Sequence, residues 1–179
     1  MRVVQSSDTV TGPAAGPVDE EAQAELAERV GELALDQGLT VAVAESLTGG
    51  VISTALSAAG RSSEWFLGGL VAYSSDVKHD VLDVPEGPVV SATAASAMAR
   101  GVRGLLKADV AVAVTGAGGP GGQDGREPGT VFLAFDGRDE HRVMRLHLDD
   151  EPKVVCATTA AAALRVLVEC LELLADERG

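Results

Sequence analysis

The chain has few aromatic residues, with one Trp, one Tyr and three Phe among 179 residues. Apolar residues as a whole make up 46% and charged residues 23%, which is typical of a globular protein and excludes a chain that is disordered throughout. The core must therefore be built mainly from Val, Leu and Ala, with slim helices lying close to a sheet. The length suits one compact α/β domain and is short for two.

Basic residues are also scarce, with 14 Lys and Arg against 27 Asp and Glu and a formal net charge of -13. Nucleic acids and anionic membranes attract proteins through clustered Lys and Arg, so we expect neither as a partner. A small phosphorylated ligand is not excluded, because backbone amides at a helix N-terminus can hold a phosphate without any lysine.

Cysteine is represented twice, by Cys156 and Cys170. In one predicted helix they would lie about 21 Å apart, too far for a disulfide, and we interpret them as small buried residues in a reducing compartment. No basic-then-apolar signal peptide opens the chain, and Lys153, Arg165 and Glu169 interrupt the apolar closing helix. We expect a cytoplasmic protein whose last helix is buried or faces a second copy of the chain, and does not span a membrane.

The hydrophobic pattern predicts a flexible extension over residues 1–17 and a single domain over residues 18–179. Apolar residues at helical spacing indicate helices, and short β-branched runs indicate strands. The predicted helices cover residues 19–37, 48–59, 75–82, 91–107 and 152 onward, and the predicted strands cover 39–46, 67–74, 108–116, 130–137 and 141–148. This order predicts a three-layer α/β/α sandwich around a mostly parallel, mixed sheet.

Three segments of unusual composition follow predicted strands, at residues 44–50, 72–78 and 114–122. Ligands of open α/β sheets bind beyond the carboxyl ends of the strands, so we expect these segments to form the site. In the first of them, Ser46 or Thr48 is either the cap of the next helix or part of the site. The two glycines that follow cost the helix about 1 kcal/mol each, which favours a close approach of the backbone to a ligand.

The second segment contains Tyr73 and Lys78. A lysine on a solvated helix face has no function by itself, but one that faced Ser46 in a partly desolvated cleft would have a lowered pKa and could accept the hydroxyl proton. His79 is interpreted as a surface residue. His141 and His147 have no further ligands to complete a set, so we expect no metal.

The third segment opens a glycine-rich loop over residues 116–129. A dinucleotide-binding fingerprint must open a helix, whereas this loop leads into a strand. A short-chain dehydrogenase is also disfavoured, because four residues and not three separate Tyr73 from Lys78. We therefore expect no cofactor, and we interpret Thr115 and the loop amides as a nest for an anion or oxyanion.

Four ordered motifs together resemble the CinA C-terminal domain family, the nicotinamide-nucleotide amidases. They are VAVAESLTGG (41–50), RSSEWFLGGLVAYSSDVK (61–78) with the following VLDVP (81–85), VAVTGAGGPGG (112–122) and EPGTVFLAF (127–135). The similarity covers roughly residues 20–175. It implies a three-layer α/β domain that hydrolyses nicotinamide mononucleotide to nicotinic acid mononucleotide and ammonia without a metal, and it suggests a homodimer.

The resemblance also implies roles for individual residues. The family's nucleophile falls on Ser46 and its general base on Lys78, with Tyr73 and Thr115 in support. Substrate binding falls on the residues around them, namely Glu45, Thr48, Gly49, Gly50, Gly116, Gly118 and Gly119. Backbone amides of residues 48–50 or 116–122 would hold the oxyanion, and others the phosphate.

One departure from the family bears on activity. The family carries Gly-Asp-Arg at the start of its last helix, where this chain reads Asp149-Asp150-Glu151-Pro152. Losing a guanidinium and gaining carboxylates weakens an anion site, unless Arg126 or Arg145 takes its place in space. Two alternatives therefore stay open beside the amidase: a non-catalytic nucleotide-binding or interaction module, and an amidase for a less anionic substrate.

Overall fold

A computed structural model describes residues 20–119, 121–138 and 140–176. The extension predicted over residues 1–17 lies outside the described residues.

The described residues form one five-stranded sheet in the order β2-β1-β3-β4-β5. Its strands are β1 (Val41–Glu45), β2 (Phe66–Val71), β3 (Val110–Gly116), β4 (Thr130–Asp136) and β5 (His141–His147). β1 lies between β2 and β3 and is parallel to both, whereas β4 is antiparallel to β3 and to β5. Four of these five strands therefore run in the same direction, and the predicted mostly parallel, mixed sheet is confirmed.

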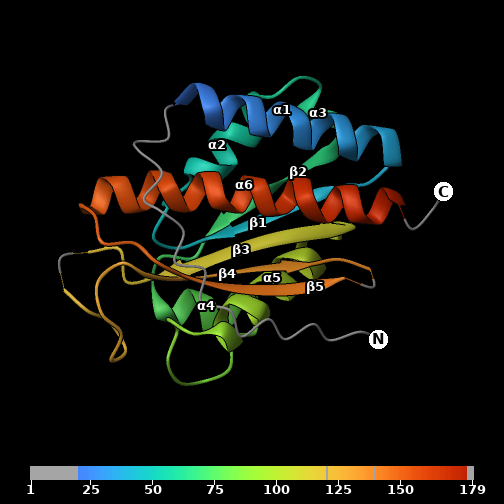
Figure 1. The fold of residues 1–179 in the computed structure, drawn as a ribbon. Helices are drawn as coiled ribbons and strands as arrows, with labels where there is room; N and C mark the ends of the chain where they lie inside the picture. Colours follow the sequence, from blue (N-terminus) through green and yellow to red (C-terminus); the bar gives the residue numbers. More distant parts are fainter. Residues whose placement is uncertain (1–19, 120, 139, 177–179) are drawn as a thin grey trace.

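Helices cover both faces of the sheet. They are α1 (Glu20–Gln37), α2 (Val51–Ala58), α3 (Ser62–Trp65), α4 (Ser75–Leu82), α5 (Ala92–Leu106) and α6 (Pro152–Asp176). α1, α2 and α6 lie on one side and α4 and α5 on the other (Figure 1). The predicted three-layer α/β/α architecture is confirmed, while the short helix α3 was not predicted.

The central strands are buried on both faces, which explains their continuous apolar sequences. Val41 and Val43 point into a cluster with α1, α2 and α6, and Ala42 and Ala44 point into a second cluster with α5. Alanines dominate the second cluster, so α5 lies close to the sheet, as the shortage of aromatic residues predicts.

Among the described helices, α6 alone is long and apolar enough to cross a membrane by length and composition, but 56% of its most apolar window is buried inside the fold. It packs against α1, α2, β3 and β4, as a core helix does. Cys156 and Cys170 both lie on α6 as free thiols. Burial raises the pKa of Cys170 to about 12, so this thiol stays protonated and inert.

Candidate functional site

The three segments singled out in the sequence meet at one edge of the sheet. The backbone amide of Ala72 donates to the carbonyl of Glu45 at 2.7 Å, so the chain leaves β1 and β2 side by side. Ser46 follows the first of these strands directly, and Gly116 ends β3 on its other side. Parallel pairing of β1 with both neighbours is the reason, because it places all three carboxyl ends together.

A cavity of about 460 Å³ opens at this edge. Ser46 is 7% exposed on its wall, and Tyr73 stands at its rim with 74% of its surface exposed. Its lining consists of Ser46, Leu47, Tyr73, Gly116, Ala117, Gly118, Gly119, Gly121, Gly122, Gln123 and Pro152. The predicted residues Gly116, Gly118 and Gly119 thus lie on the same cavity as the predicted nucleophile.

Glu45 is fully buried beside Ser46, on the other side of the strand end. Its Oε2 accepts hydrogen bonds from Thr48 Oγ1 at 2.7 Å and from the amides of Gly50 and Ile52 at 3.1 Å, and its Oε1 accepts from the amide and hydroxyl of Ser53 at 2.8 and 2.7 Å. A carboxylate from the preceding strand therefore caps α2, a favourable place for a negative charge.

This cap corrects two sequence-based expectations. The second helix begins at Val51 rather than at Thr48, and its N-cap Gly50 makes no side-chain cap bond. Neither Ser46 nor Thr48 is the cap, because Glu45 supplies the acceptor and Gly50 adopts a left-handed φ of 108°. The signal in the sequence was Glu45, the acid one residue before Ser46. Its hydrogen-bond donors lie three to eight residues further along the chain.

The start of α2 is consequently closed to a ligand anion. The amides of Gly50, Ile52 and Ser53 donate to Glu45, while those of Gly49 and Val51 donate to the carbonyls of Ser46 and Thr48. The amides of residues 48–50 were one of two predicted oxyanion donor sets. Since those of Gly49 and Gly50 are occupied, the loop over residues 116–122 is the better candidate.

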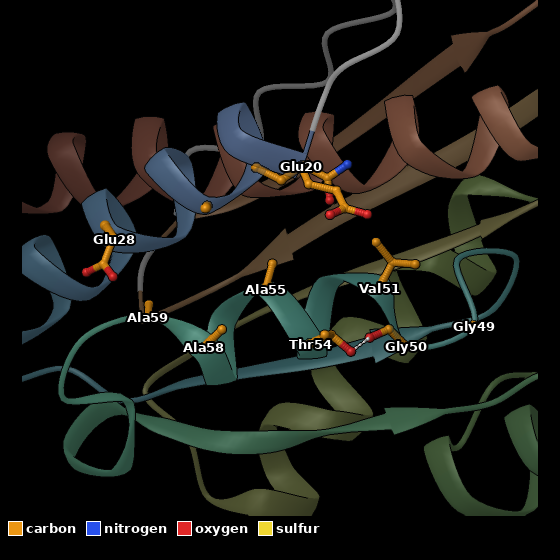
Figure 2. A pocket seen from close by; sticks show the side chains of 11 residues that line it. Glu20, Glu28, Gly49, Gly50, Val51, Thr54, Ala55, Ala58 and Ala59 are labelled. Atoms are coloured by element: carbon orange, nitrogen blue, oxygen red, sulfur yellow. Dashed lines mark hydrogen bonds between the residues drawn. The ribbon is translucent and has the colours of Figure 1, made fainter.

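Gly49 and Gly50 line a different hollow, a groove of about 480 Å³ between α1 and α2. Figure 2 shows Val51 and Ala55 of α2 facing Glu20 of α1 across this groove. Four of its eleven lining residues are alanine, and none is lysine or histidine. The structure thus separates these two glycines from the cavity that Ser46 lines.

We expect Glu45→Ala to lower the free energy of unfolding by about 3 kcal/mol or more, because it leaves the Thr48 hydroxyl and the amides of Ile52 and Ser53 without an acceptor. Urea unfolding followed by circular dichroism measures the change. Glu86→Ala is the matched control, since Glu86 is exposed and its loss should leave the midpoint in place. Equal stability of the two variants would contradict the capping role.

Lys78 lies on α4 with 1% of its surface exposed. Its Nζ donates to the carbonyl of Tyr73 at 3.3 Å, which holds the amine beside the chain that leaves β2. Burial lowers the pKa of Lys78, and the negative charge of Asp124 opposes this shift. Within the described residues Lys78 has no ion-pair partner within 4.0 Å and no hydrogen bond to Ser46, so the Ser46–Lys78 pair stays a prediction.

Thr115 and Asp124 fasten the segment that precedes α5. Thr115 Oγ1 donates to the carbonyl of Val89 at 2.7 Å, and Asp124 Oδ2 accepts from the amides of Val89 and Val90 at 2.7 and 2.9 Å. Asp124 was missed in the sequence, although Asp124-Gly125 is a strong signal for a tight turn. Asp124 and Gly125 both have positive φ, and Gln123 and Arg126 pair across this turn.

The glycine loop comes close to Leu47. A Cβ at Gly118 would lie 3.1 Å from the Leu47 side chain, so a larger residue there would push the loop away from the strand end. The amide of Ala117 donates to Thr130 O at 2.9 Å. Those of Gly118 and Gly119 make no hydrogen bond to another described residue, and both glycines line the cavity.

A family model of the CinA C-terminal domain matches residues 23–171, nearly the whole of the described chain. The chain belongs to the CinA C-terminal domain family. A CinA-like protein of Geotalea daltonii is 43% identical over 136 residues, which are 73% of this chain and 33% of that protein. A CinA-like protein of Geobacter sulfurreducens is 41% identical over 141 residues, 75% of this chain and 34% of its own length. The chain thus spans about a third of the relatives that it matches by sequence.

Solved structures of the CinA family share the fold over their full length. A CinA superfamily protein of Klebsiella pneumoniae superposes with a TM-score of 0.80 at 31% identity, covering 84% of this chain and 98% of that one. The competence/damage inducible protein CihA of Agrobacterium tumefaciens gives a TM-score of 0.76 at 36% identity, covering 84% and 96%. The resemblance stated from the motifs is therefore confirmed for family and fold.

Proposed function

We propose that this CinA-family protein is an amidohydrolase that converts nicotinamide mononucleotide to nicotinic acid mononucleotide and ammonia. The observation that carries the proposal is Ser46 on the wall of a cavity at the carboxyl ends of three parallel strands, with the buried amine of Lys78 on the adjoining helix. A lysine whose pKa is lowered by burial is a suitable base for a serine nucleophile.

Acylation begins when Ser46 Oγ attacks the carboxamide carbon and its proton passes to Lys78 Nζ. The carbonyl π pair moves to oxygen, and the amides of Gly118 and Gly119 donate to this oxyanion. When the carbonyl re-forms, the C–N bond breaks and the Lys78 proton leaves with the nitrogen as ammonia. An ester to Ser46 remains.

Deacylation repeats the same steps with water. Lys78 takes a proton from the water as its oxygen attacks the ester carbon, and returns that proton to Ser46 Oγ as the ester bond breaks. The balance is one carboxamide and one water consumed, and one carboxylic acid and one ammonia formed. The mechanism requires Lys78 Nζ to reach Ser46 Oγ in the substrate complex, where catalytic hydrogen bonds commonly tighten.

Supporting roles are proposed for Tyr73 and Thr115. The carbonyl of Tyr73 holds Lys78, and its exposed ring at the rim can cover the nicotinamide. Thr115 holds the Val89 segment, so its contribution is to position the wall on the α5 side. We also propose that the protein forms a homodimer and acts in the cytoplasm.

An amidase for a less anionic substrate is the second candidate. The exposed carboxylates of Asp149, Asp150 and Glu151 directly precede Pro152, which lines the cavity, and they would repel a phosphate at that end. A binding module without turnover is the third.

Incubation with nicotinamide mononucleotide, followed by assays for ammonia and nicotinic acid mononucleotide, separates the three. Equal amounts of both products support the proposal. Nucleotide binding without product indicates the module. Turnover of neutral carboxamides without turnover of the nucleotide indicates the second candidate.

A further inference from the structure

Two arginines contact one aromatic ring near the site. The guanidinium carbons of Arg126 and Arg145 lie 5.6 and 6.0 Å from the ring centroid of Phe132, within the range of cation–π contacts. Both arginines are exposed, and in the described part of the chain neither makes an ion pair or a side-chain hydrogen bond. Carboxylates do pair with Arg29, Arg61, Arg103, Arg138 and Arg142.

Strand pairing places Phe132 and Arg145 at the same level of the sheet as Ser46, the candidate nucleophile. Thr115 is opposite Phe132, and Phe132 is opposite Arg145, so the three lie in one row on one face of the sheet. Continuing the register of β1 and β3 by two residues places Ser46 at the level of Thr115. With about 4.8 Å between strands, Phe132 lies two strands and about 10 Å from Ser46, and Arg145 about 14 Å.

Arg126 belongs to the glycine-rich loop and contacts Phe132 from there. The tight turn at Asp124-Gly125 pairs Arg126 with Gln123, and Gln123 lines the cavity of Ser46. The loop that carries the proposed oxyanion donors thus also delivers a guanidinium to Phe132. Gln123 at the cavity and Arg126 at Phe132 thus belong to the same turn.

We infer that Arg126 and Arg145 bind the phosphate group of a ligand whose carboxamide lies at Ser46. The assignment rests on the proposed function. Each guanidinium lies within 6.0 Å of the same ring centroid, so the two positive charges are at most about 12 Å apart and favour an anion beside them. In a chain of net charge -13 these two arginines have no described carboxylate partner. Contacts with the ring leave the N–H groups free to donate to phosphate oxygens.

The inference fixes which way a nucleotide lies. Exposed carboxylates at residues 149–151 directly precede Pro152, which lines the cavity. Arg126 and Arg145 lie outside the lining of the cavity, beside Phe132 of β4. Repulsion from these carboxylates favours a ligand that has its carboxamide at Ser46 and its phosphate toward Phe132.

The test compares the double variant Arg126→Gln/Arg145→Gln with Arg100→Gln/Arg165→Gln. The control loses the same two charges from exposed sites on α5 and α6, and its arginines also lack described carboxylate partners. Two quantities are measured for each protein: the ratio of kcat/KM for nicotinamide mononucleotide to that for nicotinamide riboside, and the binding of inorganic phosphate by calorimetry.

We expect the double variant to lower the nucleotide-to-riboside ratio about a hundredfold and to abolish phosphate binding, with the control unchanged. Phosphate should also inhibit nucleotide turnover competitively. Equal losses for both substrates, an unchanged ratio, or phosphate that binds without competing would each overturn the assignment.

Phosphate binding, measured by calorimetry, tests the anion site separately from the amidase activity. If the unaltered protein turns over neither substrate, the proposed function fails, and the competition is measured by nucleotide binding instead. Phosphate that displaces the nucleotide, and that only the Arg126/Arg145 variant fails to bind, would still support the anion site. No phosphate binding, or equal binding in the two double variants, would reject it.

Discussion

Ser46→Ala should lower kcat/KM for nicotinamide mononucleotide by about 10⁴-fold or more, since the proposed covalent route needs an oxygen nucleophile at this position. Ser46 is a small side chain, 7% exposed, on the cavity wall, so its loss removes an oxygen without leaving a large void. The assay is release of ammonia under saturating and limiting substrate. Nucleotide binding should survive, because the phosphate and ring contacts remain.

The matched control for this variant is Ser57→Ala. Ser57 is an exposed serine of α2 whose hydroxyl donates to Thr54 O, and its removal should leave turnover within about twofold of the unaltered protein. Ammonia release by Ser46→Ala at the rate of this control would reject Ser46 as the nucleophile.

Lys78→Met should lower kcat/KM by about 10³-fold while the protein stays folded. Methionine fills much of the volume of the buried lysine stem, and the amine that it replaces has one hydrogen bond in the described structure, to Tyr73 O. Lys107→Met makes the same chemical change at an exposed residue that ends α5. Thermal unfolding of both variants checks the fold, and full activity of Lys78→Met would exclude Lys78 as the base.

The pH profile gives Lys78 a signature that a purely structural role would not produce. The base must be neutral, so kcat/KM should rise with pH through the pKa of Lys78, which burial holds below 10.5. Asp124 raises this pKa, so Asp124→Asn should move the rising limb to lower pH, while its side-chain oxygen can still accept from Val89 and Val90. A limb that stays in place or moves to higher pH would contradict the assignment.

Local signals in the sequence predicted most of the helices and strands. Residues 75–82 form α4 as predicted, with Ser74 capping its first turn, and Ser91 caps α5 as predicted. Pro152 begins α6, where its missing N–H costs nothing. These features depend on neighbouring residues, so the sequence alone is sufficient to predict them.

The meeting of the three motifs could also be predicted, because parallel strands that are neighbours in a sheet end at the same edge. The sequence therefore predicted the edge of the sheet at which Ser46 and Tyr73 line one cavity, while the catalytic roles of Ser46, Tyr73 and Lys78 stay predictions. It did not predict the role of Glu45, which was expected to contact the substrate. Its carboxylate instead accepts five hydrogen bonds, from two donors just before α2 and three donors on α2.

Folding alone decided which polar groups are satisfied and which stay available. Asp124 accepts a hydrogen bond from Val89 and raises the pKa of Lys78 only because the glycine loop turns back over the sheet. Arg126 and Arg145 meet at Phe132 through a turn and a strand pairing that no local pattern encodes. Hydrophobic periodicity determines elements and faces, whereas hydrogen bonds and charge pairs between distant segments depend on distances of a few ångströms that only packing sets.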